Sequence, residues 1–233
     1  MRQAERPAGR DAELELNQID PGGLLGDWVL HLQARVHLEE AELARLVEDL
    51  LQLARLEEEG VPPPREPVDV TPLVHHVVAL MRPQAEGGGV VLDVAVCSGL
   101  RWPVNPELFT RILFNLLDNA LRHTPAGGRV TVEALTDRKD EAGILRVADT
   151  GEGIPPEDLP RIFDRFYRVD RARARATGGT GLGLAIVRRA VEHHGGTINV
   201  TSRPGGGTTF EIAFPFNKTV TTFHTGETSG PYT

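Results

Sequence analysis

The most informative segment of this sequence is L-F-T-R-I-L-F-N-L-L-D-N-A-L-R-H-T, residues 108–124. Its apolar residues recur every three or four positions, which is typical of a helix with one buried side. Asn105 and Pro106 supply an N-cap and a first helical residue, so we expect a helix over about residues 106–123. The expected buried side consists of Ile112, Leu113, Leu116, Leu117, Ala120 and Leu121.

A second face of that helix carries Asn115, Asn119 and Arg122. Two carboxamides at positions i and i+4 can direct neutral oxygens at a hard cation, and the guanidinium can meet phosphate. Mg²⁺ together with ATP fits this set of groups. The alternative is that Asn115 and Asn119 merely lie at the solvent edge of an amphipathic helix.

The loop A-D-T-G-E-G-I-P, residues 148–155, follows an apolar segment that is expected to be a strand. Gly151 and Gly153 allow a close backbone approach that a Cβ would obstruct. Asp149, at the end of the strand, can accept a hydrogen bond from an exocyclic amine such as N6 of adenine. The same D-x-G-x-G pattern is also common in ordinary turns.

A glycine-rich segment, T-G-G-T-G-L-G-L-A-I-V at residues 177–187, precedes an apolar helix. The N–H groups in the first turn of such a helix can hold phosphate. A dinucleotide-binding loop is not expected here, because the residues before the glycines show no strand pattern.

The segments around these motifs alternate between strand and helix patterns. Thr71 and Pro72 are expected as the N-cap and first residue of a helix that ends near Pro83. A further helix is expected at 182–194, and strands are expected at 90–96, 100–104, 129–135, 144–149, 197–202 and 208–214. This order predicts an α/β fold, a sandwich in which helices cover one face of a mixed sheet.

Composition restricts the possible functions. The 233 residues include 33 acidic and 25 basic side chains and carry a formal charge of −8, so we expect no nucleic-acid partner. Cys97 is the single cysteine and the histidines lack metal-ligand spacing, so neither an internal disulfide nor a structural metal is expected. Without an apolar run near ~18 residues or a signal-peptide pattern, we expect a cytoplasmic chain with no membrane segment.

Proline-rich and polar stretches suggest the domain boundaries. We expect a mobile arm at 1–25, a helical segment at 26–60, a proline-rich linker at 61–69, a compact domain at 70–215 and a disordered tail at 216–233.

The helical segment has an apolar stripe and a polar outer side, and Asp49 is expected on the outer side. We expect the stripe to pair with a second copy or with a helix of another chain, because an isolated amphipathic helix needs cover. The alternative is packing on the chain's own compact domain. The stripe consists of Leu43, Leu46, Val47, Leu50, Leu53 and Ala54.

All three motifs in this order, together with R-I-F-D-R-F-Y-R at 161–168, resemble the catalytic and ATP-binding domain of bacterial sensor histidine kinases. The resemblance covers about residues 70–215 and implies the Bergerat fold, which gyrase, Hsp90 and MutL share. ATP would lie between the N-box helix and a lid at residues 168–180. The family's boxes correspond to Asn115–Asn119 (N), Asp149–Gly153 (G1), Phe163–Phe166 (F), Gly179–Gly183 (G2) and the last glycine turn, Gly205–Thr208.

The resemblance also implies roles for single residues. Asn115 and Asn119 would hold Mg²⁺, Arg122 would meet the phosphates, and His123 would lie along the nucleotide. Phe163, Phe166 and Tyr167 are expected to pack at the base of the lid rather than to touch the nucleotide. The other implied nucleotide-binding residues are Asp149, Gly151, Gly153, Gly179, Thr180, Gly181, Leu182 and Gly183.

Residues 41–57 look like the second helix of the family's dimerisation and phosphotransfer hairpin. The family's phosphoaccepting histidine lies on the first helix and is followed by an acidic residue and, a few positions on, a proline. His31 and His37 are each followed by leucine, so neither fits that pattern. Either the chain is a fragment or divergent product, or its phosphoaccepting histidine belongs to another polypeptide.

The expected function is therefore that of a histidine kinase catalytic domain in a two-component system, which passes the γ-phosphoryl group of ATP to a histidine of a phosphotransfer chain or homodimer partner. A response regulator would act downstream. One alternative is an ATPase of the gyrase and Hsp90 type, but those enzymes carry a glutamate general base where this chain has Asn115, and an amide cannot accept that proton. The other alternative is a nucleotide-binding regulator without catalysis.

Overall fold

The computed structural model describes residues 43–57, 64–137, 139, 141–169 and 180–216. Residues from Ala44 onward belong to one compact unit. The arm expected at 1–25, the two histidines at positions 31 and 37, most of the expected lid and nearly all of the expected tail lie outside the described residues.

A five-stranded mixed sheet forms one layer of this unit. Its strand order is β2-β4-β5-β7-β6, in which β2 runs parallel to β4 and every other neighbouring pair is antiparallel. The mixed sheet confirms the predicted fold class. The strands are β2 (Val91–Val96), β4 (Arg129–Asp137), β5 (Ala142–Asp149), β6 (Thr197–Arg203) and β7 (Gly207–Pro215).

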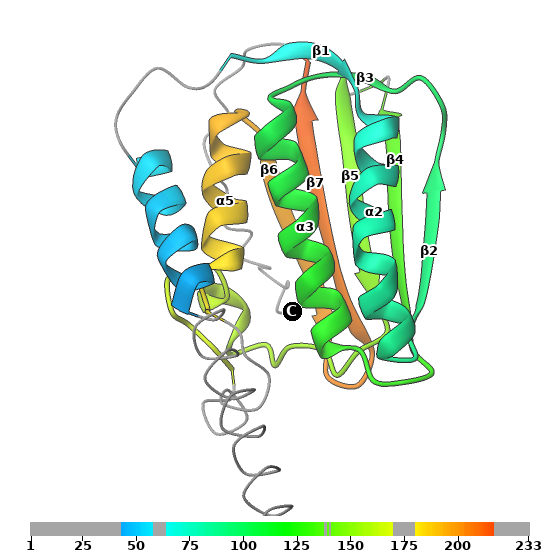
Figure 1. Ribbon diagram of the computed structural model, residues 1–233, viewed down its shortest axis with the longest axis vertical. Coiled ribbons are helices and arrows are strands. Elements are labelled where there is room, and N and C mark those ends of the chain that lie inside the picture. The colour runs from blue at the N-terminus through cyan, green and yellow to red at the C-terminus, as the bar shows by residue number, and fades with distance from the viewer. Residues whose placement is uncertain (1–42, 58–63, 138, 140, 170–179, 217–233) are drawn as a thin grey trace, which may run out of the picture. The chain divides into compact units, whose positions relative to one another are not determined.

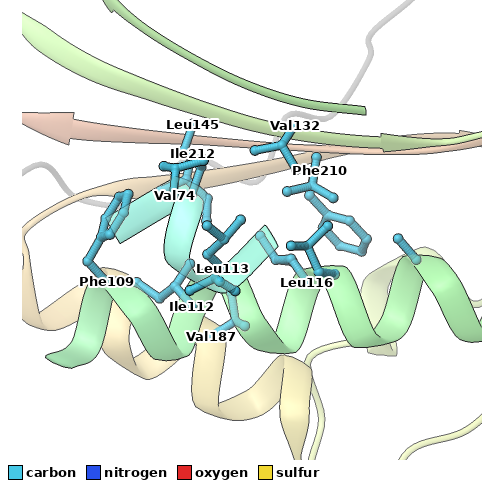
Figure 2. Packing of buried hydrophobic residues seen from close by; sticks show 14 of the residues in the cluster. Val74, Phe109, Ile112, Leu113, Leu116, Val132, Leu145, Val187, Phe210 and Ile212 are labelled. Atoms are coloured by element: carbon cyan, nitrogen blue, oxygen red, sulfur yellow. The ribbon is translucent and has the colours of Figure 1, made fainter. Parts of the chain in front are cut away.

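Three helices lie side by side over one face of this sheet (Figure 1). Figure 2 shows side chains of α3, such as Leu113 and Leu116, and of the sheet, such as Leu145 and Phe210, filling the layer between them. The apolar face of the segment at 108–124 is therefore buried, as its spacing predicts. The helices are α2 (Val70–Gly87), α3 (Pro106–His123) and α5 (Gly183–His193), and a short 3₁₀ turn, η1, spans Leu159–Arg161.

Helix α2 differs from its prediction at both ends. Its N-cap is Asp69, not Thr71, and the Asp69 carboxylate accepts a hydrogen bond from the Thr71 N–H at 3.0 Å. The helix also continues through Pro83 as far as Gly87. Met81 and Ala85, on either side of the proline, are both buried, and this packing maintains the helix across the missing hydrogen bond.

The last four residues of the predicted linker form a strand instead. β1 (Glu66–Asp69) pairs antiparallel with β3 (Arg101–Val104) in a separate two-stranded sheet. Pro67 and Pro103 face each other in this pair, where each strand has a free edge and a missing N–H is tolerated. The compact domain thus begins before residue 70.

The helix at residues 43–57 packs on the compact domain, but most of its predicted apolar stripe stays exposed, so the pairing of that stripe with a partner remains a prediction. Leu53 and Leu56 are buried in the same core as α3 and the sheet, whereas Val47, Leu50 and Leu51 remain exposed. The prediction for Asp49 is wrong, because this residue is 4% exposed. In the described part of the chain, no helix combines the length and hydropathy that a membrane crossing requires.

Candidate nucleotide-binding site

Asn115 lies where α3 meets the start of α5. It is 6% exposed, and its side-chain N–H donates to the Arg111 carbonyl oxygen at 3.1 Å. A Cβ added to Gly183 would lie 3.1 Å from Asn115 Oδ1, so the amide oxygen borders the first residue of α5. Asn115 is therefore not at a solvent edge, and Asn119, one turn further along α3, is half-buried.

Asp118 links the same helix to the helix at residues 43–57. Its Oδ2 accepts hydrogen bonds from Arg45 at 2.6 Å and from Arg122 at 2.9 Å. Burial by itself would raise the pKa of Asp118, but the hydrogen bonds and charges of the two arginines outweigh it and hold that pKa below its usual value. The ionised carboxylate thereby fixes Arg122, which the sequence assigns to the phosphates.

The end of α3 lies against the loop that follows β5. His123 Nδ1 lies 2.9 Å from Glu152 Oε1, and the Glu152 N–H donates to the His123 carbonyl oxygen at 3.3 Å. A Cβ on Gly151 would lie 2.3 Å from that same carbonyl oxygen. Only glycine leaves room for the His123 carbonyl oxygen at position 151. This backbone contact explains why the sequence pattern requires a glycine there.

The turn between β6 and β7 covers the other side of this loop. The Gly205 N–H donates to the Glu152 carbonyl oxygen at 2.7 Å. Gly153 has a φ of 71°, and a Cβ there would lie 2.0 Å from the Arg203 carbonyl oxygen. The last glycine turn of the sequence prediction therefore packs directly on the loop at 149–153.

Asp149 ends β5 and is held by two backbone groups. Its Oδ1 accepts from the Gly151 N–H at 2.8 Å and from the Thr208 N–H at 3.2 Å. Burial raises the pKa of Asp149 above its usual value, and these two hydrogen bonds oppose that shift only in part. Sequence reasoning did not identify Thr208 as a partner of Asp149. The group that binds Asp149 is the Thr208 backbone N–H, and a backbone contact leaves no pattern of side-chain types in the sequence.

The turn before α5 contains the remaining predicted residues except Gly179, which lies outside the described residues. Thr180 Oγ1 accepts from the Leu182 N–H at 3.2 Å, and Leu182 is fully buried. Gly181 has a φ of 71°, and its carbonyl oxygen accepts from the Phe166 N–H at 2.9 Å. The turn is thus connected to the segment predicted as the F box.

The prediction for the aromatic residues of that segment is wrong at one position. Phe163 is half-buried and meets the Phe210 ring edge-on, and the Tyr167 hydroxyl donates to Asp158 at 2.6 Å. Phe166, in contrast, is 57% exposed and has a φ of 61°. Its N–H donates to the Gly181 carbonyl oxygen of the turn before α5, and its side chain is left mostly exposed to solvent.

The structure therefore brings α3 into contact with the loop after β5, at His123, and with the start of α5, at Asn115. Two acidic residues that sequence reasoning did not assign to the site, Asp118 and Asp49, hold side chains of these elements. The i, i+4 spacing of Asp118 and Arg122 is a sequence signal that could have identified Asp118 as the partner of Arg122. Among the described residues, no three His, Cys, Asp or Glu side chains gather closely enough to hold a metal ion.

Residues 104–218 match the family model described as histidine kinase-, DNA gyrase B-, and HSP90-like ATPase. The chain is 40% identical over 177 residues to the sensor protein SrrB of Staphylococcus aureus. That match covers 76% of this chain and 30% of SrrB, so the chain spans less than a third of the length of this relative.

Two solved structures are also similar. Full-length ShkA in complex with AMPPNP matches with a TM-score of 0.66 and 34% identity, over 76% of this chain and 37% of ShkA. A mycobacterial sensor histidine kinase, MprB, matches with a TM-score of 0.56 and 31% identity, over 65% of this chain and 97% of the MprB structure. Because sequence, fold and the order of the site motifs agree, the chain belongs to the sensor histidine kinases and contains their catalytic ATP-binding domain.

Proposed function

We propose that this chain transfers the γ-phosphoryl group of ATP to a histidine of a phosphotransfer chain or of a homodimer partner, within a two-component system. The observation that carries the proposal is that α3 contacts two of the motifs, the loop at 149–153 through His123 and the start of α5 at Gly183 through Asn115. Phosphoryl transfer requires mainly positioning and charge neutralisation, and this arrangement suits both.

Asn115 and Asn119 would hold Mg²⁺. Their carboxamide oxygens are hard, neutral donors of the kind this ion accepts, and Asn115 Oδ1 lies beside Gly183, where an added Cβ would be 3.1 Å away. The bound ion would neutralise part of the phosphate charge. Arg122, kept in place by Asp118, supplies further positive charge on the same helix.

Asp149 would select adenine. Both of its described hydrogen bonds end on Oδ1, so the exocyclic amine of the base would be met by Oδ2. A hydrogen bond to a charged group is typically worth about 1.5–3 kcal/mol, which is sufficient to dominate base recognition.

The nucleophile in this proposal is a histidine nitrogen of another chain. Its lone pair forms the new N–P bond while the bond between the γ-phosphorus and the bridging oxygen breaks, and ADP leaves with that electron pair. Asn115 cannot act as a general base toward water, so hydrolysis without a partner should be slow. A response regulator would then take the phosphoryl group from the histidine.

Transfer of label from [γ-³²P]ATP to a separate histidine-bearing phosphotransfer chain tests the proposal. Asn119→Ala should abolish labelling because the metal loses one of its two amide ligands. The matched control is Asn199→Ala, an exposed asparagine of the edge strand β6, which should label the partner at the wild-type rate. Unchanged labelling by the Asn119 variant would contradict the assigned role.

The same experiment separates the two alternative functions. Vigorous steady-state ATP hydrolysis without any partner would favour a gyrase-like ATPase. Nucleotide binding without transfer to any histidine-bearing chain would favour a regulator that lacks catalysis.

A further inference from the structure

We propose that Asp49, on the helix at residues 43–57, is a positioning residue for the turn at 180–183, so that docking of this helix sets the affinity for ATP. The inference rests on the proposed function of that turn as a phosphate-binding element. It assigns a role in nucleotide binding to a residue outside the motifs of the ATP-binding domain.

Asp49 joins three elements. Its Oδ1 accepts from Arg111 of α3 at 3.1 Å, and its Oδ2 accepts from the Thr180 hydroxyl at 3.0 Å. The residue is 4% exposed. A buried carboxylate is costly unless it is paired and hydrogen-bonded, so Asp49 is stable in this position only while both partners are in place.

The hydroxyl of Thr180 transmits this constraint to the backbone. A hydroxyl has a single hydrogen, and when that hydrogen is donated to Asp49 the oxygen lone pairs remain available to accept. Thr180 Oγ1 uses them to accept the Leu182 N–H at 3.2 Å, which fixes the turn immediately before α5. Without Asp49 the hydroxyl hydrogen is free to rotate, and the turn loses the group that orients it.

A second contact of the same helix supports the coupling. Arg45, one turn before Asp49, donates to Asp118 at 2.6 Å, and Asp118 in turn holds Arg122 at 2.9 Å. The docked helix therefore contacts Asp118, which holds Arg122, and also Thr180 of the turn. Both Arg122 and the turn are assigned to the phosphates. By linkage, a helix that favours the binding-competent turn must itself be held more tightly when ATP is bound.

Calorimetric titration with AMPPNP and Mg²⁺ tests the inference. Asp49→Ala should weaken binding about three- to tenfold, because the competent turn becomes only fractionally populated. The control is Glu57→Ala on the same helix, which pairs with Arg165 and Arg189 but not with the turn, and it should bind within about twofold of wild type. Equal affinities for wild type and Asp49→Ala would overturn the inference.

Combining Asp49→Ala with two substitutions of Thr180 shows whether the Thr180 hydroxyl is responsible for the loss of nucleotide affinity. The loss caused by Asp49→Ala should persist in Thr180→Ser, which retains the hydroxyl, and should vanish in Thr180→Val, which does not. An equal loss in both backgrounds would overturn the inference, since a general structural role for Asp49 predicts that result. If Asp49→Ala does not fold, Asp49→Asn carries the same comparison, because Arg111 and Thr180 donate to different oxygens of Asp49 and asparagine has an oxygen at only one of those two positions.

Amide hydrogen exchange gives a readout that needs no nucleotide. The Leu182 N–H should exchange faster in Asp49→Ala than in wild type, while amides in the middle of α3 remain unchanged. Unchanged exchange at Leu182 would contradict the inference. A wild-type chain that binds no AMPPNP would overturn the proposed function as well, whereas normal wild-type binding with an unaffected Asp49 variant would overturn only the inference.

Discussion

Gly151 lies in the loop after β5, directly against the end of α3. A Cβ at this position would lie 2.3 Å from the His123 carbonyl oxygen and 2.8 Å from Asp149 Oδ1. Because the backbone atom cannot move aside, Gly151→Ala should lower the free energy of unfolding by about 1–3 kcal/mol and abolish ATP binding. Urea unfolding and calorimetry measure the two effects.

Gly87→Ala is the matched control for this substitution. Gly87 is the last residue of α2, and a Cβ there meets nothing within 4 Å. Alanine is the better helix former, so this variant should be as stable as wild type or slightly more stable. Equal losses of stability in the two variants would show that the contact at His123 is not the cause.

Asp149 allows base recognition to be separated from folding. Asp149→Asn retains an oxygen that can accept from the Gly151 and Thr208 N–H groups, so the variant should fold. It loses the charge, and ATP binding should weaken at least about tenfold. The control is Glu211→Gln, in an ion pair with Arg146 on the other face of the sheet, which should bind ATP normally. Wild-type affinity in the Asp149 variant would exclude it from base recognition.

The residues found from sequence differ physically from those that were missed. Asn115 and Asp149 each belong to one local motif, and their spacing within it signals their chemistry. Asp49 reads as a solvent-facing residue because its partners, Arg111 and Thr180, are 62 and 131 positions away. No local pattern can reveal that a carboxylate is buried by residues so distant along the chain.

Helices α3 and α5 are joined at the other end of the domain by His194. This residue is the C-cap of α5 and is 1% exposed. Its Nε2 accepts from the Asn105 N–H at 3.0 Å, and its Nδ1 lies 2.6 Å from the Ala190 carbonyl oxygen, so the neutral ring satisfies both contacts. Burial, followed by the charges of Arg65 and His193, lowers the pKa of His194 below its usual value.

This lowered pKa predicts how stability depends on pH. The unfolded chain takes up a proton at His194 below about pH 6.5, whereas the folded chain does so only at lower pH. The unfolded state thus binds more protons, so the contribution of His194 is complete above about pH 6.5 and is lost as the pH falls through the folded pKa. Urea midpoints measured from pH 8 to pH 5 should fall in wild type and fall less in His194→Gln. The same decrease in both proteins would contradict this assignment.

The elements themselves were predictable where several signals agree. α3 has an N-cap, a proline at its first position and a continuous apolar period, and its observed bounds equal the predicted ones. β1 and the end of α2 were missed because Pro67 and Pro83 are read from sequence as breaks. In the folded chain Pro67 lies on a strand with a free edge, where a missing N–H is tolerated. Pro83 stays within α2 because Met81 and Ala85, on either side of it along the helix, are buried.

On the scale of the whole molecule, the helix at 43–57 should unfold together with the ATP-binding domain. Leu53 is 2% exposed and belongs to the common core, so Leu53→Ala should lower the free energy of unfolding by about 2–5 kcal/mol. Leu51, on the same helix, is 56% exposed, and Leu51→Ala should change the free energy of unfolding by less than about 0.5 kcal/mol. Chemical denaturation distinguishes the two, and equal effects would mean that the helix does not share the core.

The position of β7 has a consequence for synthesis. β7 is the last described strand along the chain, yet it lies between β5 and β6 in the sheet. While the ribosome is still producing residues 207–215, β5 has an open edge and β6 has no neighbour. Such unpaired edges recruit strands from other molecules. A nascent chain that stalls at this point is therefore expected to aggregate more readily than a chain in which β7 has filled the gap.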